Sequence, residues 1–330
     1  MNLTECVEAR AAPSGPVARR ARVRRTRGGG AAAALARGVI VLTPAAVHAQ
    51  QLEPRAYSNA PVGLNFFVAG YGHSEGGLST DPSLPLQDAR LRVHSGVLAY
   101  ARAIDLWGRS GKFDLILPLS QLSGTALVAG LPIERHVSGF GDPRLRLSVN
   151  FYGAPALDLP RFAAYQQDLV VGGSVQVSAP AGQYDPSKAV NLGSNRWSIK
   201  PDIGFSKALG RLTLDMTAAV AILGSNDDFF GGQTRKQAPI YSVQSNISTN
   251  FSGGIWAALG ATFYSGGRTT VDGVRKDDAL SNSRYGLTVA LPLNRNDSIK
   301  LDASSGISTR TGTSFDTLGM AWQHRWGAGL

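Results

Sequence analysis

Residues 317–326 read Thr-Leu-Gly-Met-Ala-Trp-Gln-His-Arg-Trp, so that large apolar side chains alternate with small or polar ones. Alternation with a period of two is typical of a β-strand with one apolar face. That face carries Trp322 and Trp326 close to the end of the chain. Amphipathic strands with aromatic residues near their ends are what a transmembrane β-barrel requires. The stretch therefore predicts a strand whose apolar face meets lipid.

The same alternation recurs along the chain after about residue 60. It predicts an all-β fold, a transmembrane antiparallel up-and-down β-barrel of about 12 strands in the bacterial outer membrane. Connections after odd-numbered strands are mostly long and polar and the others mostly short, as in outer-membrane barrels. A soluble all-β sandwich or barrel is the alternative, but a soluble sandwich gives no reason for this sorting of loops. The expected strands are 63–71, 90–104, 111–122, 139–151, 169–179, 196–206, 210–223, 239–251, 254–265, 283–291, 298–309 and 315–326.

The composition agrees with a membrane barrel. Charged residues make up only 17% of the chain, against about 25% in soluble domains. No apolar run reaches the roughly 18 residues of a transmembrane helix. The net charge of +10 comes largely from residues 1–49, which hold eight Arg and only two Glu. Because this basic excess lies outside the predicted barrel, we expect no nucleic-acid partner.

The first 49 residues resemble a secretory signal peptide. A basic region precedes the apolar stretch 38–47, and Val47-His48-Ala49 approximates the A-x-A cleavage pattern. A disordered basic tail is the alternative. Cys6, the only cysteine, lies in this leader, so the exported chain needs no disulfide bond. The predicted organisation is a leader over 1–49, a periplasmic N-terminal linker over 50–62, the outer-membrane barrel over 63–326 and a C-terminal tail over 327–330.

Charged residues in the middle of the predicted strands fall on the face opposite the apolar one. A charge that faces lipid at mid-depth costs about 2–4 kcal/mol, so these side chains are expected in the lumen. They either form a polar, selective pathway or fill a narrow barrel as a structural ladder of ion pairs. The second interpretation is favoured because small barrels fill with side chains. The set is Arg92, His94, Asp114, Arg144, Arg146, Lys200, Asp202, Asp215, Lys300 and Asp302.

Four motifs lie at the predicted external rim, and a fifth precedes the first strand. They are Gly139-Phe-Gly-Asp-Pro143, Pro180-Ala-Gly-Gln-Tyr184, Asn191-Leu-Gly-Ser-Asn-Arg-Trp197, Asn226-Asp-Asp-Phe-Phe-Gly-Gly232 and Leu52-Glu-Pro-Arg-Ala-Tyr-Ser-Asn-Ala-Pro-Val-Gly63. With them, residues 52–326 resemble a family of bacterial outer-membrane proteins named for the meta-pathway of phenol degradation. The resemblance implies a channel or transporter that passes small hydrophobic or aromatic compounds by diffusion. The chain departs from such barrels by continuing beyond Trp326 to Leu330.

The rim motifs also supply the candidate solute-binding residues. Aromatic rings offer faces on which a planar solute can stack, although Tyr184 and Trp197 also suit the aromatic girdle of a membrane barrel. Asn and Asp side chains can hydrogen-bond the backbone of the loops. We expect no metal and no cofactor. The candidates are Phe140, Asp142, Tyr184, Asn191, Asn195, Trp197, Phe229 and Phe230.

Two other functions compete with transport. A barrel enzyme acting on lipid or lipopolysaccharide needs a nucleophile within reach of a base, yet alternation puts His94 and Ser95 on opposite faces, and no Gly-x-Ser-x-Gly motif occurs. A structural or adhesion barrel without transport is the other alternative. The expected partners are outer-membrane lipid and lipopolysaccharide, a small hydrophobic solute and the barrel-assembly machinery.

Overall fold

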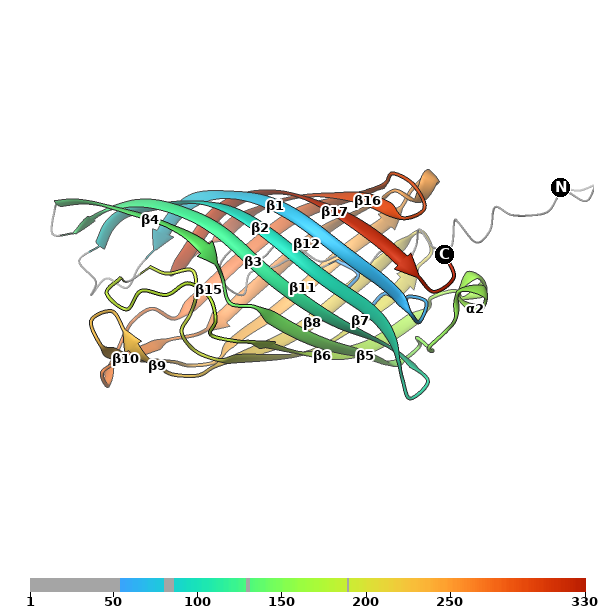
Figure 1. Ribbon diagram of the computed structural model, residues 1–330, viewed down its shortest axis with the longest axis horizontal. Helices are drawn as coiled ribbons and strands as arrows, with labels where there is room; N and C mark the ends of the chain where they lie inside the picture. Colours follow the sequence, from blue (N-terminus) through green and yellow to red (C-terminus); the bar gives the residue numbers. More distant parts are fainter. Residues whose placement is uncertain (1–53, 80–85, 129–130, 189) are drawn as a thin grey trace, which may run out of the picture.

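The structure is a computed structural model that describes residues 54–79, 86–128, 131–188 and 190–330 (Figure 1). Two short helices, α2 (Leu159–Ala164) and η2 (Ser252–Gly254), accompany the strands. A small sheet at one end contains β9 (Asn226–Phe229), β10 (Gln233–Gln237), β13 (Thr269–Val271) and β14 (Val274–Arg275). The wall strands are β1 (Leu64–Ser79), β2 (Leu86–Leu106), β3 (Arg109–Val128), β4 (Leu131–Phe140), β5 (Arg144–Tyr152), β6 (Leu169–Ser178), β7 (Ser198–Leu209), β8 (Leu212–Leu223), β11 (Ile240–Asn250), β12 (Trp256–Gly266), β15 (Leu280–Pro292), β16 (Asp297–Ser308) and β17 (Gly312–Gly327).

The wall strands close into an antiparallel barrel. Closure follows because β1 pairs with both β2 and β17, and β2 pairs in turn with β3. β4 and β5 both pair with β3, β4 along residues 119–128 and β5 along residues 111–116. They are therefore two parts of one strand position in the barrel wall, which we call a stave. Counted this way, the described part of the wall has twelve staves, which confirms the predicted barrel and its strand number.

The two ends of the barrel differ (Figure 1). We call the end with the start of β1, the end of β17 and α2 the turn end, because its connections include tight turns at 107–108 and 210–211. The other end, which carries β4 and the small sheet, is called the loop end. Several hairpins continue here beyond the predicted strands: β1 runs to Ser79, although residues 72–79 were predicted to be loop. Here the alternation of apolar and polar residues ends, but the backbone hydrogen bonds between neighbouring strands continue.

The fourth predicted strand, 139–151, is interrupted. Residues 141–143 leave the ladder between β4 and β5. Pro143 has no N–H to give to a neighbouring strand, and the Asp142 carboxylate is engaged in a loop rather than by the wall. The short strands of the small sheet also lie in segments that were predicted to be loops.

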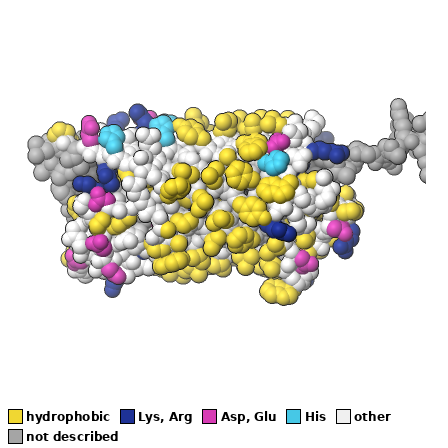
Figure 2. All heavy atoms as spheres, viewed as in Figure 1, with side chains coloured by type: hydrophobic (Ala, Val, Ile, Leu, Met, Phe, Trp, Pro, Cys, Tyr) yellow, Lys and Arg dark blue, Asp and Glu magenta, His cyan; other side chains and the backbone are white. Residues whose placement is uncertain are grey.

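A belt of apolar side chains surrounds the middle of the barrel (Figure 2). Ile247, Leu259 and Leu318 on three different strands are 51%, 66% and 66% exposed. Their sequence neighbours Asn246, Ala258 and Thr317 point inward or are less exposed. A closed barrel with an apolar outer band and charged ends has the architecture of an integral outer-membrane protein. Lipid, not a second protein layer, covers this face.

The inner face of the wall is divided into two kinds of surface. From β1 to β3 it is mainly apolar, with a buried cluster that includes Phe66, Val68 and Ala99. From β5 to β8 and from β11 to β16 it is mainly polar, with buried residues such as Arg146 and Asn246. This division places an apolar wall opposite polar staves inside one lumen.

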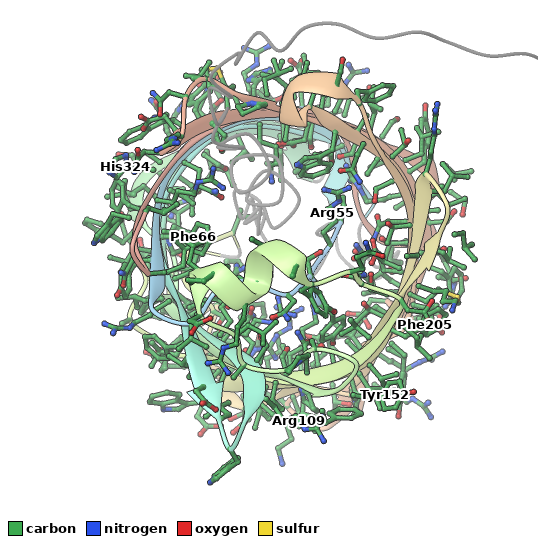
Figure 3. The ribbon with its side chains drawn as sticks, turned by 90° about the vertical axis from the view of Figure 1, so that its right-hand side faces the viewer. Arg55, Phe66, Arg109, Tyr152, Phe205 and His324 are labelled. Atoms are coloured by element: carbon green, nitrogen blue, oxygen red, sulfur yellow. The ribbon has the colours of Figure 1, made fainter. Side chains whose placement is uncertain are left out.

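The helix α2 lies across part of the turn end (Figure 3). Asp158 caps it by accepting a hydrogen bond from the Arg161 N–H at 3.0 Å, as N-cap carboxylates do. Phe162 is its buried residue. In the described part of the chain, no helix is long and apolar enough to cross a membrane.

Candidate functional site

Residues 54–62, which we call the inner segment, enter the barrel near its turn end, and Arg55 projects into the lumen (Figure 3). Arg55 is only 3% exposed. Its Nη2 donates to Asn250 Oδ1 at 2.7 Å and its Nε to Ser248 Oγ at 3.3 Å. The guanidinium also lies over the buried ring of Trp256, 4.6 Å from the ring centroid. A buried cation needs such partners, so these contacts anchor the segment.

Tyr57 fixes the inner segment to β5, β6 and β7, on the other side of β8 from the strands that hold the Arg55 side chain. Its hydroxyl donates to Asp202 Oδ1, and its carbonyl accepts from Asn150 Nδ2 at 3.1 Å. The Tyr57 ring lies against Gly172 and Gly204, where an added Cβ would come within 2.6 and 2.5 Å of ring atoms. Glycine at these two wall positions therefore makes room for the ring.

The rest of the inner segment is bound to the turn between β5 and α2. The Val62 N–H donates to the Leu157 carbonyl at 2.8 Å, and Asn59 Nδ2 donates to the Pro155 carbonyl at 3.1 Å. The sequence predicted only a periplasmic linker over 50–62, and alternation gave no indication of these contacts. The inner segment thus lies in the lumen at the turn end.

A cavity of about 430 Å³ lies on the loop-end side of the inner segment. It extends from Ala56 of that segment to Leu280 and Gly312 at the loop end. Leu91, Val93 and Leu122 supply an apolar wall, whereas β5 to β8 supply a polar one. Small-molecule sites commonly have volumes of about 300–1,000 Å³, so the cavity has room for one small organic solute.

Residues 179–188 and 190–197 belong to a loop that folds into the lumen and is held there by Asp142. One carboxylate oxygen of Asp142 accepts from the Gly182 N–H at 3.0 Å. The other accepts from the Ser194 N–H at 2.8 Å and from the Ser194 hydroxyl at 2.6 Å. Two glycines allow the close packing: a Cβ on Gly182 or Gly193 would lie 2.7 Å from a backbone carbon of the adjacent segment. Asp142 is therefore the centre of a compact loop knot.

Polar side chains of the other motifs complete the loop knot. Asn226 Nδ2 donates to the Tyr184 hydroxyl at 2.8 Å, and Asn226 Oδ1 accepts from Asn195 Nδ2 at 3.0 Å. Asn191 Oδ1 accepts from the Asp185 N–H at 2.9 Å. The structure thus brings together the four motifs that the sequence placed separately at the rim, namely 139–143, 180–184, 191–197 and 226–232.

Eight of the ten charged residues predicted for the lumen lie inside the barrel. Arg146 pairs with Asp202 at 3.4 Å, and the Asp215 carboxylate accepts from the Arg55 N–H at 3.3 Å. The lumen beside the inner segment thus holds an ion pair and a hydrogen-bonded carboxylate, while the cavity extends toward the loop end. The eight are Asp114, Arg144, Arg146, Lys200, Asp202, Asp215, Lys300 and Asp302; of these, Arg144, Arg146, Lys200 and Asp202 line the cavity.

The lumen assignment is wrong for Arg92 and His94, which lie on the outer face of β2. Arg92 pairs with Glu75 at 3.3 Å, and the Tyr71 hydroxyl lies 2.7 Å from His94 Nδ1. The lumen face of β2 is instead apolar and carries buried Val93. Charge identified the lumen face elsewhere, but here the inner wall is apolar and the charged side chains lie near the loop end, where water can solvate them.

The predicted aromatic group at the rim does not form one site. Phe140, Trp197 and Phe230 are 58%, 61% and 47% exposed and do not line the cavity. Tyr184 and Phe229 do line it. Phe229 and Phe230 are consecutive, with ring centroids 6.3 Å apart, and only the first reaches the cavity.

Two cavity residues, Arg196 and Arg235, were missed by sequence reasoning. Arg196 stands inside the quoted motif 191–197, and Arg235 stands in the small sheet. Arg196 is buried and its Nη2 donates to Gln237 Oε1 at 2.5 Å. Arg235 lies over the Phe229 ring, 5.1 Å from the ring centroid. The sequence predicts solvated loops for the segments that contain both residues, so it gives no reason to expect them in the lumen. Only the folding of those loops turns the side chains inward.

Loss of the Asp142 carboxylate is expected to loosen the loop knot. Asp142→Ala removes three hydrogen bonds to a charged group, each worth about 1.5–3 kcal/mol. Trypsin should then cut after Lys188, an exposed residue of the loop, much faster than in the unmodified protein. Asp227→Ala, a change at an exposed carboxylate of β9, is the matched control. Equal cleavage in both variants would show that Asp142 does not hold the loop.

Comparisons with known proteins agree with this architecture. The family model described as “Putative MetA-pathway of phenol degradation” matches residues 72–323, which confirms the resemblance seen in the motifs. An outer membrane channel from Pseudomonas putida F1 has the same fold, with a TM-score of 0.72 and 22% identity over 84% of this chain and 100% of that chain. The transport unit of the autotransporter AIDA-I from Escherichia coli aligns with a TM-score of 0.48 and 6% identity over 84% of this chain and 93% of that chain. No curated protein matches the chain by sequence.

Proposed function

We propose that this protein, which belongs to the MetA-pathway phenol-degradation family, is an outer-membrane channel through which small hydrophobic or aromatic compounds diffuse. The observation that carries the proposal is the cavity of about 430 Å³ enclosed by the barrel. Its volume suits one small aromatic molecule. In bacterial single-chain barrels the long loops face the medium and the short turns face the periplasm, so the cavity would take up solute from outside.

The inner segment defines the second half of the proposed route. It separates the cavity from the turn end, with Ala56 at the boundary and Tyr57 bound to the wall. A solute in the cavity must therefore pass the inner segment before it reaches the periplasm. We infer that displacement of residues 54–62 is the step that controls passage.

The competing enzyme hypothesis has no support from the positions of the histidines. Within the described residues, His73, His94, His136 and His324 lie on the outer face or in exposed hairpins rather than in the cavity. The side chain of Ser95 points into the barrel, away from that of His94. The described residues also contain no group of three or more His, Cys, Asp or Glu suited to a metal ion.

Flux through liposomes tests the proposal. Liposomes that contain lipopolysaccharide and the full-length exported protein should release labelled catechol faster than protein-free liposomes, because the cavity accepts an aromatic ring. Labelled glucose is the control of comparable size, and its release should rise much less. Catechol release no faster than in protein-free liposomes would overturn the proposed function.

A further inference from the structure

The cavity has two unlike walls, and together they specify the chemistry of a ligand. We propose that it binds an amphipathic organic anion, an aromatic or short aliphatic carboxylate, with its apolar body on the β2–β3 side and its carboxylate facing Arg196 and Arg235. The inference rests on the proposed channel function and names the class of solute that the channel prefers. Neutral phenols would then be the poorer ligands.

The apolar side is a continuous buried cluster. Val93, Leu122 and Phe315 come from three wall strands, and Leu192 comes from the folded loop. These four residues pack together and all line the cavity. A hydrocarbon or aromatic body placed against them loses contact with water, which is favourable roughly in proportion to the apolar area covered.

The opposite side has an excess of positive charge. Five basic residues line the cavity, against two acidic ones. Both acids are already engaged by the protein: Asp142 accepts from the loop knot, and Asp202 binds Arg146, Ser174 and Tyr57. Such a wall raises the local concentration of anions. The five basic residues are Arg144, Arg146, Arg196, Lys200 and Arg235.

Arg196 and Arg235 form the most specific part of the basic wall. Burial, together with the positive charge of Arg235, lowers the pKa of Arg196 to about 10. Among the described residues, the buried Arg196 Nη1 has no hydrogen-bond partner. The negative charge of Asp278 acts on Arg235, but the Arg235 guanidinium lies over Phe229 in the cavity wall. A carboxylate between the two arginines would accept hydrogen bonds from their guanidinium groups and offset the repulsion between the two cations.

The geometry also explains why a ligand needs both a carboxylate and an apolar body. An anion without an apolar body makes no apolar contact with the cluster around Leu192. A neutral aromatic alcohol covers that cluster but gives Arg196 no charged acceptor. Charge-assisted hydrogen bonds are about twice as strong as neutral ones. Of two solutes with the same ring, the one that carries a carboxylate should therefore bind more tightly.

Calorimetric titration of the full-length exported protein in lipid nanodiscs tests the inference without reliance on transport. The probes are benzoate, benzyl alcohol and acetate at pH 7.5. We expect benzoate to bind at least about tenfold more tightly than either other probe, a difference of about 1.4 kcal/mol. Benzyl alcohol equal to benzoate would overturn the anion preference, and acetate equal to benzoate would overturn the apolar wall.

Variants locate the binding in the cavity. Arg196→Gln combined with Arg235→Gln should weaken benzoate binding at least about tenfold, whereas Arg275→Gln on exposed β14 should not. Arg235→Lys, which keeps the charge, should retain more affinity than Arg235→Gln, and far-ultraviolet circular dichroism checks that each barrel is folded. Undiminished benzoate binding in the folded double variant would overturn the inference. Catechol flux in liposomes made from the same purified protein separates the two claims, because its absence counts against the channel and not against the anion site.

Discussion

Simultaneous replacement of Arg55 and Tyr57 by alanine should raise the conductance of single barrels in planar bilayers severalfold. Arg55 is held by Ser248, Asn250 and Trp256, and Tyr57 is held by Asp202. These contacts are lost together in the double variant, so the inner segment should leave the lumen for much of the time. The lumen beside it would then fill with water and ions.

The measurement has a matched control at the same end of the barrel. Arg161→Ala changes an exposed arginine of α2, whose ion pair with Asp158 is exposed and makes no contact with the inner segment in the described residues. Its conductance should equal that of the unmodified protein. An unchanged conductance in the Arg55 and Tyr57 double variant would mean that the inner segment does not restrict the lumen.

Ile247→Arg is expected to destabilise the barrel by about 2–4 kcal/mol in lipid. Ile247 is 51% exposed on the outer face of β11, so the new charge would be placed in the hydrocarbon region. The free energy of unfolding by urea in lipid vesicles measures the effect.

Gln244→Arg is the control for this change, because Gln244 lies three residues away on the same strand and lines the cavity. An odd spacing along a strand puts the two side chains on opposite faces. The Gln244 variant should lose much less stability than the Ile247 variant. Equal losses would mean that β11 does not present Ile247 to lipid.

The strands could be predicted because lipid imposes a simple rule on the outer face. Ile247, Leu259 and Leu318 each belong to a row of apolar residues that recurs with a period of two along its strand. The sorting of loop lengths then indicates the barrel. The same rule fails at Arg92 and His94, because it assigns a charged side chain to the lumen only on the ground that charge avoids lipid. Near the loop end, charge is solvated on the outer face, and the lumen face of β2 is apolar.

The candidate site was predictable only in part. The rim motifs around Asp142 and Asn226 were visible as unusual loop sequences, and the structure shows them joined in one loop knot. Their inward folding depends on hydrogen bonds between segments far apart in the chain, which periodicity does not reveal. For the same reason the sequence predicts only a linker around Arg55 and Tyr57, in a segment without alternation, although both side chains are buried inside the barrel.

The chemical accessibility of two lumen positions on β11 shows whether the cavity faces the medium and is closed by the inner segment. Cys6 is the only cysteine in the chain and lies in the predicted leader, so single cysteines can be placed at Ser242, which lines the cavity, and at Ser248, which lies behind Arg55. In intact cells, a membrane-impermeant maleimide added from outside should label Ser242→Cys quickly and Ser248→Cys hardly at all. Adding Arg55→Ala and Tyr57→Ala should make both positions reactive. Equal labelling of the two cysteines while Arg55 and Tyr57 are present would contradict a cavity that opens outward and is closed by the inner segment.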